Sequence, residues 1–566
     1  GVPSNLIGPA GNFTPDNRQT VQDIFTRNTL HVIGSYLANI GGSQHNFRFG
    51  WDLNRLANKP VAGSWPDGYV FVYWDRAYSA VTKGGNFRGP FGYYINRAFA
   101  TEGDVSSNNQ GLFINDNWRV NKKLTLNLGL RSEREFLPSF DPKIQATPIE
   151  FGFGSKLAPR LGFAYDPSGV GKMRIGASWG LYYDIMKYEM PRGSFGGDKW
   201  LDYVYTLDNP NILNIKPGAP AGFGQCACPG TLIETVNWRI PSHDPSENLI
   251  EKNLKPVRSQ VWDMSFDYNF NTDYVFRMRY THRQLDRTIE DVGILTPAGE
   301  QYYIANPGFG LTVDEKIFPA GFPTDVTPRA KRVYDGVEMG VERRFSKTLA
   351  FNASYTISRL YGNYSGLANS DENGRTSPNV NRVYDEPWMA YNEQGQLVYG
   401  RLATDRPHTF KFFGSYDLKT KAGTTRFAPR FDLFSGTPIS TELNVQHVPV
   451  FAFGRGDRGR TPFFTQTDLL VSHDIPVGGS ETKRIRIELN VANLFNHARV
   501  TNIFPTIDHA NDLGVNFDAN KLSDIFKGYN SRALMTAQKI RTDPRYGLAS
   551  EYQTPRELRL GFHFFF

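Results

Sequence analysis

The chain has 566 residues, a formal net charge of +7, a mean hydropathy of −0.45 and two cysteines. At roughly 150 residues per soluble domain this length predicts three or four domains, yet no Pro/Ser-rich linker, charge run or low-complexity tract marks a boundary. The charge is too small for this length to indicate nucleic acid as a partner, and no apolar run approaches the roughly 20 residues of a membrane-spanning helix.

The composition favours strands, because aromatic residues make up 14% of the chain and turn-forming Gly is plentiful at 54 residues. The first four residues, Gly1-Val2-Pro3-Ser4, do not resemble the basic start of a signal peptide. We therefore expect either a removed signal or a start well inside a longer product. Low mean hydropathy does not exclude a membrane barrel, whose strands alternate apolar and polar residues.

Strict two-residue alternation is the strongest pattern in the chain. In residues 124–131 every second residue is Leu, and in residues 484–491 one face is apolar and the other charged. The runs are about ten to fourteen residues long, which fits tilted strands that cross a bilayer better than the five or six residues usual in a soluble sandwich. The pattern predicts fifteen spanning strands, near residues 29–40, 44–53, 107–120, 124–136, 156–166, 171–184, 256–270, 273–288, 333–345, 348–361, 407–418, 424–436, 464–474, 483–495 and 556–566.

Short and long connections alternate along almost the whole chain. Short ones lie near 41–43, 121–123, 167–170, 271–272, 346–347 and 419–423, and long ones span roughly 54–106, 185–255, 289–332, 362–406, 437–463 and 496–555. A transmembrane barrel sorts its connections in this way, with tight periplasmic turns at one rim and large external loops at the other. The sequence therefore predicts an all-β, antiparallel, up-and-down outer-membrane barrel.

The predicted strand number is odd, whereas bacterial single-chain barrels have an even number with both termini in the periplasm. The final strand follows a long loop and so runs toward the periplasm, and the first predicted strand then does the same. We expect residues 1–28 to be the end of an external loop or an N-terminal extension, residues 29–566 to be barrel, and an odd number of strands to lie upstream. This parity depends on placing residues 70–74 inside a loop.

Motifs that would indicate chemistry are weak. Residues 176–180 match G-x-S-x-G, but the pattern lies within a predicted strand and not at the strand-to-helix turn that a nucleophile needs. We predict no catalytic, cofactor-binding or metal site and no enzymatic activity. Five charged residues on the expected inner face, which we expect to pair with neighbouring strands or with a plug, are Arg277, Arg279, Arg484, Arg486 and Glu488.

The two cysteines, Cys226 and Cys228, lie in the long external loop 185–255. In an oxidising compartment this C-x-C pair predicts a local disulfide. Metal ligation is the alternative, but no cluster of histidines lies nearby.

Several segments resemble TonB-dependent receptors. The hairpin of residues 110–131, the stretch 156–166 and Asn490-Val491-Ala492-Asn493-Leu494-Phe495-Asn496 are typical of that family, and Gly-rich loops and hairpins such as Tyr334-Asp335-Gly336-Val337-Glu338 suit its Oar-like branch. The resemblance runs from about residue 29 to the end. It implies a 22-stranded barrel, of which this chain holds the last fifteen strands, and an N-terminal plug that is not recognisable here.

The last eight residues resemble the outer-membrane assembly signal, in which a polar residue is followed two residues later by Gly and then by alternating aromatic residues up to the last position. Here these residues are Arg559, Gly561, Phe564 and Phe566. The alternating residues Leu558, Leu560, Phe562, Phe564 and Phe566 are expected to face lipid, with the terminal rings at the membrane interface. An ordinary amphipathic edge strand is the alternative.

The resemblance implies a transporter for a large or scarce solute, energised from the inner membrane through a plug. Implied partners are outer-membrane lipid, the barrel assembly machinery, the TonB complex if a plug is present, and another chain if one supplies the plug or missing strands. The alternative is a receptor-derived structural or surface-interaction barrel without transport, and a weaker one is a passive pore.

Overall fold

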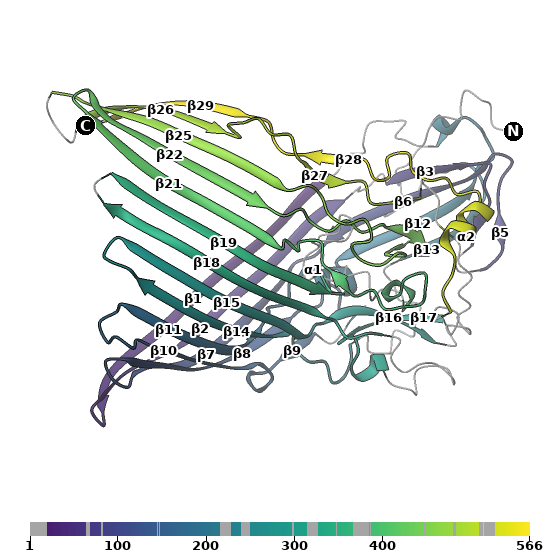
Figure 1. Cartoon of the computed structure of the whole chain (residues 1–566). Helices are drawn as coiled ribbons and strands as arrows, with labels where there is room; N and C mark the ends of the chain where they lie inside the picture. The colour runs from purple at the N-terminus through teal and green to yellow at the C-terminus, as the bar shows by residue number, and fades with distance from the viewer. Residues whose placement is uncertain are drawn as a thin grey trace.

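The computed structural model describes residues 20–63, 68–80, 83–143, 145, 148–215, 228–238, 250–296, 299–313, 327–346, 348–365, 384, 387–445, 448–478, 483–508, 513 and 527–566. One antiparallel sheet, here called the wall, dominates these residues (Figure 1). Each of its strands pairs with the next in chain order. The wall strands are β1 (Thr20–Ile40), β2 (Ser43–Gly63), β7 (Val105–Arg119), β8 (Leu124–Leu137), β10 (Leu157–Tyr165), β11 (Met173–Tyr183), β14 (Arg258–Asn269), β15 (Tyr274–Arg287), β18 (Arg332–Ser346), β19 (Leu349–Gly362), β21 (His408–Thr420), β22 (Gly423–Phe434), β25 (Phe464–Pro476), β26 (Arg484–Ala492) and β29 (Glu557–Phe565).

These strands confirm the fifteen spanning strands predicted from alternation. Figure 1 shows the wall as a curved sheet with the short turns at one end and the long connections at the other. In the first turn Ile40 pairs with Ser43, and the two residues between them, Gly41 and Gly42, have φ of +59° and +78°. Two-residue hairpin turns that match strand twist require positive φ, which glycine adopts without steric cost.

The first hairpin is longer than predicted. β1 begins at Thr20, so the boundary expected between residues 28 and 29 lies inside a strand, and β2 continues to Gly63 into the predicted loop 54–106. The pairing is unbroken from Ile40–Ser43 to Thr20–Gly63. Asparagine side chains, which break the apolar pattern, support the extra length, because Asn54 accepts from Arg27 and Asn58 donates to Asp23.

A second set of strands extends from the wall at its loop end. β6 (Gly92–Glu102) pairs with the end of β2 through Val61–Gly63 and carries β3 (Tyr69–Trp74) and β12 (Asp198–Thr206) on its two edges. β13 (Leu232–Asn237) pairs with β12. Residues 70–74 therefore lie in a strand outside the wall, so the number of spanning strands stays odd. We call β3, β6, β12 and β13 together the loop sheet.

The remaining elements are short and lie between wall strands. They are β4 (Tyr78–Ser79), β5 (Asn86–Phe87), β9 (Ile149–Phe151), β16 (Glu290–Thr296), β17 (Gly299–Ala305), β20 (Gly400–Arg401), β23 (Leu443–Val445), β24 (Val448–Val450), β27 (Val500–Ile503), β28 (Ala549–Tyr552), α1 (Glu189–Ser194), α2 (Ser531–Ala537) and the 3₁₀ turns η2 (Phe153–Lys156), η3 (Ile212–Asn214), η4 (Gly310–Val313) and η6 (Pro387–Ala390). None of the described helices is long and apolar enough to cross a membrane.

The buried apolar residues lie mainly in the long connections and not between wall strands. One cluster joins Phe151, Met190, Val292 and Tyr364, which come from four different connections or their flanking residues. A second cluster joins residues of the three connections that follow β19, β22 and β26 and includes Met389, Leu443 and Leu513. Because these contacts link connections far apart in the chain, the described parts of the loops pack against one another at that end of the wall, and we call them the cap.

Candidate functional site

The wall has an apolar and a polar face, set by the pairing register. In the β14–β15–β18 segment the outward positions pair Met264 with Tyr280 and Phe266 with Met278. The opposite positions pair Asp263 with Thr281, whose hydroxyl donates to the carboxylate at 2.6 Å. Apolar side chains at the outward positions are exposed, and Met264 keeps 54% of its surface accessible. Such exposure would be costly in water, so this face is suited to hydrocarbon.

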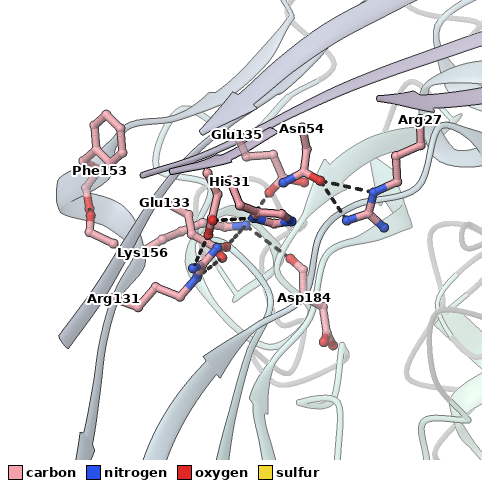
Figure 2. Close-up of polar contacts among 11 residues, drawn as sticks. Arg27, His31, Asn54, Arg131, Glu133, Glu135, Phe153, Lys156 and Asp184 are labelled. Atoms are coloured by element: carbon pink, nitrogen blue, oxygen red, sulfur yellow. Dashed lines mark hydrogen bonds and ion pairs between the residues drawn. The ribbon is translucent and has the colours of Figure 1, made fainter. Parts of the chain in front are cut away.

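The polar face carries a chain of ion pairs near the cap (Figure 2). Asp52 on β2 accepts from Arg131 Nη1 at 2.6 Å and contacts His31 Nδ1 at 2.6 Å, and Arg131 Nε donates to Glu133 at 2.7 Å. These side chains come from β1, β2 and β8, while Lys156 lies where η2 meets β10. We call these five residues with Glu135 the rim network.

Lys156 is fully buried within the rim network. Its ammonium lies 2.5 Å from Glu135 Oε2, 3.9 Å from Glu133 Oε2 and 3.3 Å from the carbonyl oxygen of Asp184, to which it donates. The other oxygen of Glu135 accepts from the backbone N–H of Met186 at 2.6 Å. A buried charge is tolerated only when it is paired and hydrogen-bonded, so these contacts tie the segment after β11 to β8.

Bidentate ion pairs also lie on the polar face between the C-terminal wall strands β21, β22, β25 and β26. Arg426 donates to both oxygens of Asp417 at 2.7 and 2.8 Å, and Arg486 to both oxygens of Asp474 at 2.6 and 2.9 Å. The expected inner residue Arg277 pairs with Glu342 at 2.6 Å. Of the five expected inner charges, Arg277, Arg484 and Arg486 pair with carboxylates of neighbouring strands.

Several inner guanidinium groups have no such partner. Arg48, Arg119, Arg174 and Arg279 lie on the polar face, and no carboxylate in the described parts of the chain is within ion-pair distance of them. Each is exposed. These cations therefore leave exposed positive charge on the polar face.

The cap contains buried polar groups as well as apolar ones. The hydroxyl of Thr288 donates to Tyr364 Oη at 2.8 Å, and Tyr364 and Tyr384 are both almost fully buried. Burial, reinforced by the negative charge of Glu290, raises the pKa of both tyrosines well above its ordinary value. Two-residue alternation gives no signal for these contacts, which is why the sequence did not reveal the cap.

An ion pair between a partly buried arginine and a buried aspartate fastens the loop sheet. Arg97 on β6 donates to both oxygens of Asp202 on β12 at 2.7 Å each, and the indole N–H of Trp238 donates to Asp202 at 2.9 Å. The guanidinium also lies 4.8 Å from the ring centroid of Trp200. Arg97 therefore joins neighbouring strands of the loop sheet.

The four residues of the predicted assembly signal lie on or beside β29. Phe564 and Phe566 are on the apolar face, 58% and 93% exposed, and their rings stack at 6.0 Å. Arg559 and Gly561 are on the polar face, where Arg559 donates to Glu557 at 2.7 Å. Their recognition by assembly machinery stays a prediction.

The other sequence motifs have plain outcomes. Ser178 of the G-x-S-x-G match lies within β11 and pairs with Asp263 in register, so the sharp turn of a nucleophile is absent there. Cys226 lies outside the described residues, so its disulfide with Cys228 stays a prediction. Among the described side chains no group of three or more His, Cys, Asp or Glu is placed to hold a metal.

Comparisons with known proteins agree with this geometry. Residues 153–436, half of the chain, match the family described as outer membrane beta barrel domain. Over 493 residues the chain is 25% identical to the TonB-dependent transporter Oar of Myxococcus xanthus, a match that covers 83% of this chain and 44% of that protein. The resemblance to Oar-like TonB-dependent receptors is confirmed, and the chain spans less than half the length of this relative.

Two solved structures are similar at low identity. The outer membrane transporter YddB from Escherichia coli is 12% identical with a TM-score of 0.46, covering 86% of this chain and 52% of that one. The ferripyoverdine receptor of the outer membrane of Pseudomonas aeruginosa is 12% identical with a TM-score of 0.45, covering 86% and 46%. These relatives are named as transporters or receptors and not as enzymes.

Proposed function

The chain belongs to the outer membrane beta barrel domain family, and from that premise we propose that it forms the wall of a TonB-dependent-receptor-like transporter. Its place is the cell outer membrane, which it crosses with strands. The proposed cargo is a solute too large or too scarce for passive diffusion through porins. The proposed energy source is the inner membrane, acting through a plug domain and the TonB complex.

The packed cap is the observation that carries this proposal. A pore that only sieves solutes needs an opening, whereas here several connections share buried apolar cores that give the external end a defined shape. Side chains with fixed positions can recognise one ligand, because little conformational entropy is lost on binding. The cap therefore supports capture of a specific solute.

The polar face supports the transport step. Paired charges such as Arg486 with Asp474 hold the wall together, while exposed cations such as Arg174 and Arg279 remain without a carboxylate partner among the described residues. A plug that fills the concave side would need polar contacts of this kind. Exposed inner charges suit contacts with such a plug, which supports transport.

The proposal is tested by uptake in the producing bacterium. The gene is disrupted and complemented with the wild-type protein or with Val292→Asp, which places a charge at a fully buried position of the cap. Depletion of large solutes from the medium is measured by mass spectrometry with and without a protonophore. We expect uptake of at least one solute to require both the protein and the proton gradient, and Val292→Asp to abolish it.

Leu213→Asp is the matched control, because Leu213 is a loop residue that is 76% exposed. It should leave uptake unchanged. Uptake that depends on the protein but not on the proton gradient would indicate a passive pore. Equal solute depletion in the disrupted and complemented strains would indicate a structural or surface-interaction barrel and would sink the transporter proposal.

A further inference from the structure

We propose that Lys331 and Arg359 form a binding site for the phosphate group of an outer-leaflet lipid, on the outer surface of the wall. The site lies where β18 and β19 reach the cap. It differs from the solute-capture surface and does not depend on transport.

The register places both cations on the apolar face. Arg359 pairs with Asp335, which contacts His282 Nδ1 at 2.8 Å, and His282 pairs with the outward-facing Trp262. Lys331 directly precedes β18, two residues before Val333, whose pairing partner is Tyr361 on the same face. Both charges therefore lie on the side that meets lipid.

Their height matches the membrane interface. Arg359 lies ten residues along β19 from Leu349, which adjoins the short turn at the periplasmic end. At about 3.4 Å per residue and a usual tilt of roughly 40°, that is about 26 Å across the membrane. The apolar band of such barrels is about 25 Å tall, so Arg359 is level with the phosphate-bearing headgroups of the outer leaflet.

The two cations are held by aromatic rings and not by carboxylates. The guanidinium of Arg359 lies 4.6 Å from the ring centroid of Tyr361, and the ammonium of Lys331 lies 5.7 Å from the same centroid and 5.6 Å from that of Tyr399. Asp335, opposite Arg359, interacts with it electrostatically, but no carboxylate of the described residues is within ion-pair distance of either cation. Their neighbour Arg401, by contrast, is 3.7 Å from Asp405.

This arrangement suits a phosphorylated lipid. A ring can hold two cations near each other without neutralising them. Asp335 accepts from Tyr280 and contacts His282, so it offsets only part of the Arg359 charge and the pair keeps positive charge for an anion. A tyrosine ring is also favoured at the interface, where one side is apolar and the other wet. Directly toward the membrane interior the same face presents Ile357, 46% exposed, and its pairing partner Val337, which an acyl chain would contact.

The test is lipid retention by the full chain in detergent, measured by native mass spectrometry with phosphatidic acid and phosphatidylcholine as probes. We expect the wild type to retain phosphatidic acid in preference. Each cation near an anionic membrane surface contributes roughly a five- to six-fold gain, so Lys331→Gln/Arg359→Gln should bind about 25-fold more weakly. Lys331→Arg keeps the charge and should bind as the wild type does.

Arg283→Gln is the matched control, because Arg283 lies at a similar height but pairs with Val261 and Tyr334 on the polar face. It should leave retention unchanged, and the double variant should keep the wild-type far-ultraviolet circular dichroism. Equal losses in Arg283→Gln and the double variant would overturn the proposal in favour of general charge. Displacement of the lipid by an equal concentration of inorganic phosphate would overturn the assignment to lipid.

Discussion

The ammonium of Lys156 lies 2.5 Å from Glu135 Oε2, and both side chains are almost completely buried. The lysine comes from the end of η2 and the glutamate from β8, so the pair fixes how the segment before β10 rests on the wall. Two charges of opposite sign removed from water together depend on each other far more than an exposed pair does.

Replacing one partner of this pair should destabilise the protein strongly. Lys156→Met leaves Glu135 buried without its cation, and breaking a buried pair in this way costs about 3–5 kcal/mol. Lys156→Met/Glu135→Leu removes both charges and should recover most of that loss. The measurement is the urea-unfolding midpoint in detergent, and a double variant no more stable than the single one would contradict the pairing.

The carboxylate of Asp166 should make one periplasmic turn sensitive to acid. Its oxygens accept from the Ser168 hydroxyl and from the backbone N–H groups of Ser168 and Gly171, which together lower the pKa of Asp166 below 3.8. Because the folded pKa is depressed, the stabilisation is present above the ordinary value and is lost as the pH falls through the folded pKa. Hydrogen exchange of residues 166–172 should therefore quicken in acid relative to the intrinsic rate.

The turn at Asn121 provides the control for this effect. Its side-chain oxygen accepts from the backbone N–H groups of Lys123 and Leu124 at 2.8 and 3.0 Å, but it does not titrate. Its protection should not change over the same pH range. Parallel loss of protection in both turns would mean that Asp166 is not the group responsible.

Gly436, just beyond β22, should not tolerate a side chain. A Cβ there would lie 1.6 Å from the carbonyl oxygen of Thr461, which is backbone and cannot rotate away. Gly436→Ala should cost about 1–3 kcal/mol by overpacking, whereas Gly152→Ala, with open space around it, should be neutral. Equal urea-unfolding midpoints for the two variants would show that the strand end adjusts freely.

The loop sheet should depend on Asp202 more than on any exposed pair. Asp202→Ala removes both hydrogen bonds from Arg97 and the one from Trp238, and it leaves a partly buried guanidinium unpaired. Limited proteolysis should then cleave near β12 sooner than in the wild type. Lys199→Ala breaks an exposed pair with Glu102 between the same two strands and should have little effect. A reversed order of sensitivity would refute this account.

Outward and inward aromatic rings at the end of β29 should differ in their effect on outer-membrane assembly. Phe564→Ala and Phe566→Ala remove rings from the apolar face and should lower the fraction of protein inserted in the outer membrane, measured by heat-modifiable electrophoretic mobility. Phe565→Ala is the control on the polar face, where the Phe565 ring lies 4.4 Å from the Arg484 guanidinium. A larger insertion defect in the control would argue against recognition through the outward rings.

The wall was predictable because each strand separates water from lipid and so must alternate. Residues 484–491 show this directly, since Ile485 and Ile487 face outward and Arg486 binds Asp474 on the inner side. Alternation gives no signal beyond the apolar band, where β1 and β2 continue without an apolar stripe. Their pairing there is supported by side-chain amides such as that of Asn58, which donates to Asp23. Alternation alone therefore placed the start of β1 nine residues too late.

The rim network and the cap could not be predicted in this way. Lys156 meets Glu135 only because η2 brings the chain back onto β8, and a single lysine in the sequence gives no sign of burial. Val292 and Tyr364 share a core although 71 residues separate them, and no periodic pattern links the two. Contacts of this kind depend on how long connections fold against each other.

The shared core of the cap also determines which antibodies would recognise the loop end of the protein. Because residues from four connections support one another, the exposed surface is a composite of segments distant in the chain. Antibodies raised against one loop as a linear peptide would meet a different shape on the cell, whereas antibodies raised against the folded protein would recognise discontinuous epitopes. Exchange of a single loop should then disturb the shared core, whereas coordinated replacement of several loops could preserve it.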